Sequence, residues 1–289
     1  MINDEYKIKT KIPNLVHSVL LRDVSLFGIS LNRLCNDVFL GLYDQFQEGW
    51  GLPGGEGKTL QFKLNREGQN LFEFLVENHT GLFSNKAGYF RNLIMSYSNM
   101  ASFKRERVVF AERLSLVEKA VKKKVRMAFR YRDGIRIMEP YTVVTDREQE
   151  FNYIFGWCVT HKDYRNYRLS NIIPTRLLKV KQEHFDKAKA DEVKKHFDPF
   201  LSYGETVTVR FTNNGLYLFD NVKFLNQPRV LKRDGNVLVL ESSIKKAKVY
   251  LASFLDEACV LAPPELRSYF LEKARMMQKI YREEAPYDQ

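Results

Sequence analysis

One pattern occurs twice in the first hundred residues, and this repeat restricts the fold more than any other feature of the 289-residue chain. Alternating apolar residues at 6–12 predict a short strand, and two helically spaced apolar segments follow it, the second capped by Ser30. The same order returns with a strand near 60–64, a helix ending at Thr80-Gly81, and another helix for which Ser84 is the expected cap. One such unit cannot bury its own apolar faces, so we expect the two units to pair their strands antiparallel.

Two paired strands with four helices resemble the ribbon-helix-helix fold, formed here from two halves in one chain. In that family the outward side chains of the ribbon enter the DNA major groove. The matching positions are Lys7, Lys9 and Lys11 on one strand and Thr59, Gln61 and Lys63 on the other. Residues 1–100 carry 10 basic and 10 acidic side chains, so a scaffold of this fold without DNA binding is an equal alternative.

The net charge of +11 is concentrated in the middle of the chain. Residues 101–181 hold 19 basic and 9 acidic side chains, whereas residues 182–289 hold 17 and 16. The central segment also interleaves its Arg and Lys with Tyr and Phe, a mixture that grips phosphates and stacks bases. Such a distribution is typical of a nucleic-acid site, and the alternative is a basic solvated surface without a specific partner.

Short strands dominate this central segment. One helix is expected over residues 102–124, with strands at 125–131, 135–138, 151–159 and 164–169 and a hairpin turn at Asp133-Gly134. Short strands joined by tight turns predict a small barrel.

Three motifs in the segment resemble the WYL domain, an SH3-like barrel of prokaryotic regulators and defence-associated proteins. They are Arg136-Ile137-Met138-Glu139-Pro140, Asn152-Tyr153-Ile154-Phe155-Gly156-Trp157 and Arg165-Asn166-Tyr167-Arg168-Leu169. Asn152, Ile154 and Ser170-Asn171 depart from the residues usual in that family.

The resemblance implies a ligand sensor or nucleic-acid binder with a basic and aromatic pocket. The residues carried over are Arg136, Tyr153, Arg165 and Arg168, with Arg130, Tyr131, His161, Tyr164 and Tyr167 as neighbours that would complete a stacking surface. Guanidinium groups bind phosphates bidentately and tyrosine rings stack on bases. The alternatives are a core position for Tyr153, surface ion pairs for Arg165 and Arg168, and an ordinary loop position for His161.

The last third predicts the order strand, helix, strand, strand, helix, strand, which is the split βαβ, ferredoxin-like pattern. Pro263-Pro264 then opens a final helix. Its apolar face, Leu266, Tyr269, Phe270, Ala274 and Met277, suits dimerisation, and packing within the chain is an equal alternative.

The expected fold class is therefore α+β. We expect a ribbon-helix-helix-like domain at 1–100, a linker helix at 101–124, a WYL domain at 125–182, a connector at 183–203 and a C-terminal dimerisation domain at 204–289. No apolar stretch is long enough to span a membrane and the N-terminus has no signal-peptide pattern, so we expect a cytoplasmic protein. Cys35, Cys158 and Cys259 have no metal-binding or disulfide spacing.

No paired carboxylates, metal cluster or activated nucleophile emerges, so the chain is expected to be no enzyme and to need no cofactor. Taken whole, it resembles the accessory proteins of type VI-D CRISPR systems. That resemblance implies binding of single-stranded RNA through the WYL domain and stimulation of RNA cleavage by a partner RNA-guided nuclease. The alternatives are a DNA-binding transcriptional regulator, in which the ribbon reads an operator and the WYL domain senses a ligand, and a purely protein-binding adaptor.

Overall fold

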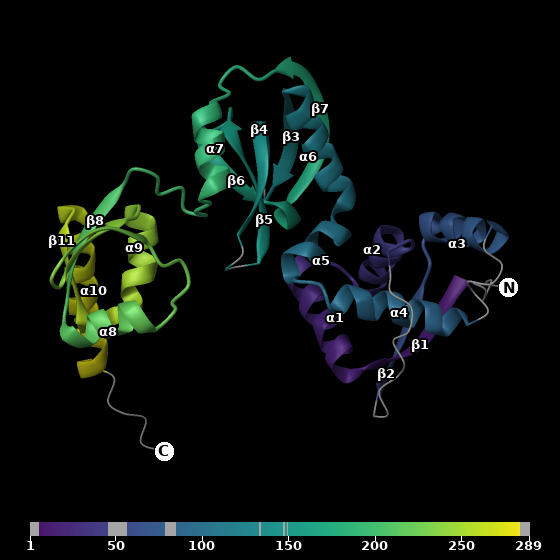
Figure 1. Cartoon of the computed structure of the whole chain (residues 1–289), viewed down its shortest axis with the longest axis horizontal. Coiled ribbons are helices and arrows are strands. Elements are labelled where there is room, and N and C mark those ends of the chain that lie inside the picture. Colours follow the sequence, from purple (N-terminus) through teal and green to yellow (C-terminus); the bar gives the residue numbers. More distant parts are fainter. Residues whose placement is uncertain are drawn as a thin grey trace. The chain divides into compact units, whose positions relative to one another are not determined.

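The computed structural model describes residues 6–45, 57–78, 85–132, 134–146, 148 and 150–283 (Figure 1). The chain forms two compact units, residues 1–194 and 195–289. Its described part is a mixed α+β structure with antiparallel sheets of two, five and four strands. Asp133 of the predicted hairpin turn lies outside the described residues, as do Thr80, Gly81 and Ser84.

The predicted repeat of strand, helix and helix is confirmed in the first unit. Its elements are β1 (Lys7–Pro13), α1 (Asn14–Phe27), α2 (Leu31–Leu42), β2 (Gly57–Lys63), α3 (Arg66–Asn78) and α4 (Lys86–Ser98). β1 and β2 pair antiparallel, with Lys7 opposite Lys63 and Lys9 opposite Gln61. Because successive side chains of a strand point to opposite faces, Ile8 and the other apolar residues of both strands point into the core.

The ends of these helices follow from a few side chains. Gly28 ends α1 in the left-handed conformation, with φ of 62°, and Ser30 accepts a hydrogen bond from the Arg33 amide at the start of α2. The prediction that Ser84 caps α4 is wrong, because the cap is Asn85, whose side chain accepts from the Gly88 amide at 2.9 Å. Asn is as good a cap as Ser, so the sequence did not distinguish the two positions.

The single helix predicted over 102–124 is two helices, α5 (Ser102–Val109) and α6 (Ala111–Lys123). Phe110 separates them with a non-helical φ of −113° and ψ of 31°. The Phe110 ring is buried against Phe27, with 5.4 Å between ring centroids, so core packing overrides the helical propensity of the segment. The break lets α5 contact α2 and the strand Phe151–Cys158, while α6 covers the strands Val125–Tyr131, Gly134–Asp146 and Ile172–Lys181.

The central sheet has the order β6-β5-β4-β3-β7. Its strands are β3 (Val125–Tyr131), β4 (Gly134–Asp146), β5 (Phe151–Cys158), β6 (Asp163–Arg168) and β7 (Ile172–Lys181), with the 3-10 turn η2 (Leu169–Asn171) between the last two. The predicted strand 135–138 was too short, since β4 continues through Pro140 with an irregularity before Thr142. β7 was not predicted from the sequence.

Gly156 of β5 lies opposite that irregularity of β4. A Cβ atom at Gly156 would run into the backbone carbonyl of Glu139, so only glycine lets the two strands approach this closely.

The second unit follows the predicted strand and helix order. Its elements are β8 (Thr206–Phe211), α8 (Asn213–Asn221), β9 (Arg229–Asp234), β10 (Val237–Glu241), α9 (Ile244–Leu251), η3 (Ala252–Glu257), β11 (Ala258–Ala262) and α10 (Pro264–Glu283). The sheet order is β11-β8-β10-β9. The helix predicted over 244–255 ends at Leu251, because a 3-10 segment follows in which Leu255 has a φ of 49°.

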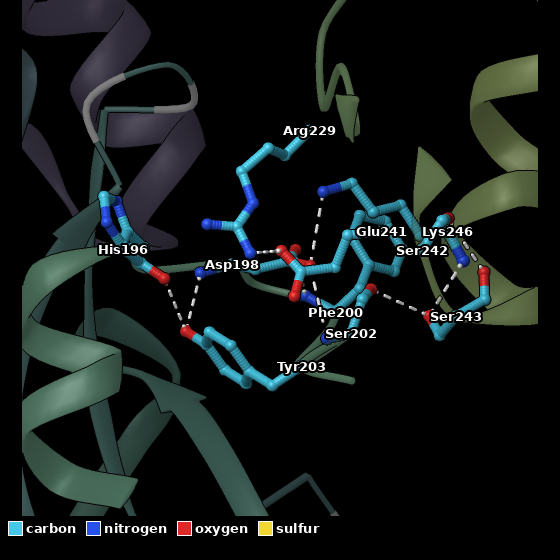
Figure 2. Close-up of polar contacts among 10 residues, drawn as sticks. All are labelled: His196, Asp198, Phe200, Ser202, Tyr203, Arg229, Glu241, Ser242, Ser243 and Lys246. Carbon is cyan, nitrogen blue, oxygen red and sulfur yellow. Dashed lines mark hydrogen bonds and ion pairs between the residues drawn. The ribbon is translucent and has the colours of Figure 1, made fainter. Parts of the chain in front are cut away.

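Residues 196–203 lead into this second unit, and polar contacts fix them to it (Figure 2). The Asp198 carboxylate accepts from the Phe200 and Ser202 amides and pairs with Lys246 Nζ at 3.2 Å. The Ser202 hydroxyl donates to Ser243 at the start of α9. The preceding helix α7 (Lys187–Lys195) belongs almost entirely to the first unit. None of the described helices has the length and apolar character needed to cross a bilayer.

Candidate nucleic-acid interface

Four of the predicted site residues come together at one end of the central sheet. Arg136 of β4 lies opposite Phe129 of β3, so both side chains share a face with Tyr131, two residues further along. The Tyr131 and Tyr167 rings meet edge to face, with centroids 5.0 Å apart. Arg165, two residues before Tyr167 on β6, lies on that same face. We call Tyr131, Arg136, Arg165 and Tyr167 the Tyr131–Tyr167 cluster.

The two arginines of this cluster are available to a ligand. Among the described residues, Arg136 donates only to the carbonyl of its neighbour Ile135, at 3.1 Å, and its guanidinium leans over Gly134, where a Cβ atom would meet it. Arg165 has an exposed side chain, and its ion pair with Asp163, at 3.5 Å, is exposed on both sides. Exposed pairs of this kind contribute about 0–1 kcal/mol, so an incoming phosphate can compete for Arg165.

The charges of Arg136 and Arg165 both act on the pKa of Tyr167, so the two guanidinium groups lie near the same hydroxyl. Burial raises the pKa of Tyr167, as does its hydrogen bond to Cys158 Sγ, whereas the positive charges of Arg165 and Arg136 oppose that rise. Tyr167 is only 5% exposed, so it packs beneath the cluster. Tyr131 is half-buried and Arg132 lies 5.6 Å from its ring centroid, so Tyr131 is the ring that a base can reach.

Arg168 and Tyr153 form a second group, and this group faces α5. Arg168 lies over the Phe151 ring, 3.2 Å from its centroid, and its Nε is 3.6 Å from Glu106 Oε1. Burial lowers the pKa of Arg168 and raises that of Tyr153 to about 12. Tyr153 and Arg168 are cross-strand neighbours on β5 and β6.

Glu106 organises this second group, and sequence reasoning missed it. The carboxylate is fully buried and accepts from the Asn152 amide at 2.7 Å, the Asn152 side chain at 2.8 Å and the Ser170 amide at 3.1 Å. Asn152 in turn donates to the Phe103 carbonyl. Asn152 differs from the residue usual at this position of the family. Its buried side-chain amide has a structural role here, because it joins the sheet to α5.

The remaining residues predicted around the barrel lie elsewhere. Arg130 is exposed on the opposite face of β3, between Ile135 and Ile173 of the neighbouring strands. His161 lies in an exposed turn. Tyr164 packs in an apolar cluster, stacked on Phe155 with centroids 5.9 Å apart.

The predicted ribbon residues share one exposed face of the β1–β2 pair. They are Lys7, Lys9, Lys11, Thr59, Gln61 and Lys63. Four positive charges and no carboxylate face outward, although the whole segment 1–100 is balanced. The count of charges over residues 1–100 therefore did not reveal this basic face.

A cleft of about 240 Å³ lies between α2 and the break of α5 and α6. Charged residues line it together with Phe110: Arg33, Asp37, Glu67, Glu112 and Arg113. Burial raises the pKa of Asp37 to about 6 despite the opposing charge of Arg33. In the residues that the structure describes, no three His, Cys, Asp or Glu side chains are grouped to hold a metal ion.

Comparison with known proteins identifies the central part of the chain. Residues 112–177 match the family model of the WYL domain, so the central sheet with α6 is a WYL domain, as its motifs predicted. No curated protein matches the sequence.

The fold is also known from a solved structure. The solved structure described as "Crystal structure of a CRISPR Cas-related protein" matches this chain with a TM-score of 0.74 and 13% sequence identity. The match covers 96% of this chain and 94% of that one. A second structure, proteasome accessory factor B/C of Arthrobacter aurescens, has a TM-score of 0.29 and 13% identity, over 100% of this chain and 51% of that one. The first match shows a shared fold, whereas the second is too weak to support an argument.

Proposed function

We propose that the protein is a non-enzymatic accessory protein that binds single-stranded RNA through its WYL domain and stimulates RNA cleavage by an RNA-guided type VI-D CRISPR nuclease. The Tyr131–Tyr167 cluster carries this proposal, because it places two available guanidinium groups beside a reachable aromatic ring. Arginine forks bind phosphates and exposed rings stack on unpaired bases, a combination suited to single strands. The fold shared with a CRISPR Cas-related protein supports the biological setting.

The proposal includes three finer assignments of fold. The β1–β2 pair with its four helices is interpreted as a ribbon-helix-helix domain, and the central sheet as an SH3-like barrel. The order β11-β8-β10-β9, with all neighbours antiparallel, supports a ferredoxin-like second unit. We further propose that this unit forms a homodimer through α10, and that the protein acts in the cytoplasm.

The test compares labelled single-stranded RNA with duplex DNA across a salt series. We expect wild-type protein to bind the RNA more tightly and the double variant Arg136→Ala, Arg165→Ala to lose at least about tenfold in affinity. Arg130→Ala is the matched control, since it removes an exposed arginine from the opposite face of β3. Equal RNA affinity of the double variant and the control would overturn the assignment of the site.

A DNA-binding regulator is the second candidate, and the outward face of the ribbon favours it. Its four lysines and Gln61 are suited to phosphates and base edges of a major groove. In that case duplex DNA would bind more tightly than RNA, and Lys9→Ala would weaken it while the two barrel substitutions would not.

A further inference from the structure

Six exposed lysines of the central segment lie near the ends of α6 and β7. They are Lys119, Lys122 and Lys123 on α6, Lys124 directly after it, and Lys179 and Lys181 on β7, which we call the α6–β7 basic surface. Neither 119–124 nor 179–181 contains an Asp or Glu. None of the six forms an ion pair with a carboxylate in the described part of the chain.

α6 and β7 lie side by side (Figure 1), and the ends that carry these lysines meet. Near the start of both elements, Arg113 donates to the Ser170 carbonyl at 2.7 Å. At their other end, Lys181 Nζ donates to the Lys123 carbonyl at 3.2 Å. Leu177 and Lys181 pair with Met127 and Val125, only two residues apart on β3, so Lys179 and Lys181 lie within roughly 7 Å along the sheet, beside the lysines of α6.

This surface is separate from the Tyr131–Tyr167 cluster. Lys181 pairs with Val125, at the opposite end of β3 from Tyr131. Six strand residues at about 3.3 Å each place these two ends roughly 20 Å apart. A ligand that reaches both must therefore be several nucleotides long or of similar size.

Other basic residues of the same segment are committed to the fold. Arg105 pairs with buried Asp23, Arg107 donates to Asn152, and Arg126 pairs with Glu139. Lysines at a helix C-terminus complement the helix dipole, which accounts for Lys122 and Lys123 alone. It gives no reason for Lys179 and Lys181 on the neighbouring strand, so the surface is a candidate site for an acidic partner.

We propose that the α6–β7 basic surface binds the sugar-phosphate backbone of single-stranded nucleic acid, continuing the strand held by the Tyr131–Tyr167 cluster. This inference rests on the proposed function and names a second contact for it. Closely spaced lysines suit the phosphates of a single strand. The surface consists of lysines, with the Phe185 ring 5.5 Å from Lys124 Nζ at its edge, so binding by the lysines themselves is largely independent of base sequence and depends strongly on salt.

The experiment measures binding of oligouridine, oligoadenine and a mixed-sequence RNA by full-length protein across a salt series. The variant carries Lys119→Gln, Lys122→Gln and Lys179→Gln, and its control carries Lys232→Gln, Lys245→Gln and Lys273→Gln in the second unit. Thermal melts check that both variants stay folded. For the first variant we expect a roughly tenfold loss of affinity, equal for all three RNAs, and a salt slope lower by about 2, since each phosphate contact in a single strand contributes about 0.7.

Two outcomes would overturn this inference alone, and a third would overturn the proposed function as well. If the first variant and the control bind RNA equally and wild type binds it well, the surface has no role in RNA binding, while the proposed function stands. If RNA binding is unchanged but nuclease stimulation is lost only in the first variant, the surface contacts protein and the inference is wrong. If wild type binds none of the RNAs even at low salt, the proposed function fails as well.

Discussion

Arg168 of β6 points at Glu106 of α5, with 3.6 Å between its Nε and Glu106 Oε1. Glu106 is fully buried, and only 17% of the Arg168 side chain is exposed. Arg168 was predicted as a ligand-binding residue from its motif. In the structure it neutralises a buried carboxylate, so we expect its main effect on stability.

We therefore expect substitution of Arg168 to change stability, whereas substitution of Arg136 should change RNA affinity. Glu106→Ala should lower the free energy of unfolding by about 3 kcal/mol, because it leaves the Arg168 guanidinium without its opposite charge and two backbone amides without their acceptor. Arg168→Ala should also destabilise while leaving the RNA affinity of the folded protein unchanged. Urea unfolding and RNA titration measure the two quantities. An Arg168→Ala protein of normal stability that no longer binds RNA would contradict this reading.

Gly156 should be intolerant of any side chain. Gly156→Ala would push a methyl group into the Glu139 carbonyl and disturb the β4–β5 pairing, so we expect a loss of at least about 2 kcal/mol. Gly204→Ala is a useful comparison, because nothing lies near its Cβ position and only its φ of 78° opposes the change. Thermal unfolding of both variants tests this, and a Gly156→Ala protein as stable as wild type would show that the strands can separate without cost.

Asp37 should make stability depend on pH. Its folded pKa of about 6 lies above its ordinary 3.8, so its contribution to stability is complete below pH 3.8 and is lost as pH rises through 6. Asp37→Asn should therefore be more stable than wild type at pH 7, by about 1–2 kcal/mol, and the gap should close towards pH 4. Urea titrations of both proteins between pH 4 and 7 measure this difference. A gap that stays constant, or widens on acidification, would contradict the assignment.

The second half of α10 should mediate self-association. Only Leu266 of this helix is buried, whereas Leu271, Met276, Met277 and Ile280 are between 42% and 54% exposed. Burying such side chains in a second copy is favourable, at about 25 cal/mol per Å². We expect Met276→Glu, Ile280→Glu to convert a dimer into a monomer in light scattering, while circular dichroism shows that the monomer stays folded. Arg275→Glu, on the same exposed turn, is the control, and a double variant that remains dimeric would remove α10 from the interface.

Much of the fold could be predicted because periodicity is local. The alternation of β1 and β2 and the helical spacing after each strand are both visible within a dozen residues. The break at Phe110 was not visible, because it depends on packing against Phe27, far away in the sequence. β7 was missed for a related reason, since it pairs with β3, more than 40 residues earlier.

The site could be predicted only in part. Motif positions predicted Arg136, Arg165 and Tyr167 for one site, and the structure brings them close together, while their role in binding stays a prediction. The partner of Arg168 was out of reach, since Glu106 comes from a helix outside the motifs. The charge count over residues 1–100 also did not reveal the basic face of the ribbon, because a sum over residues does not show which side chains share a face.

The most direct test of RNA binding by the WYL domain is a map of the residues that touch RNA. Ultraviolet crosslinking of full-length protein to single-stranded RNA, followed by mass spectrometry, provides it. We predict crosslinks at Tyr131 and in the peptides that carry Arg136 and Arg165, all of which Arg136→Ala should weaken. Crosslinks confined to the β1–β2 ribbon, around Lys9 and Gln61, would contradict the account and favour a protein that binds nucleic acid through its ribbon.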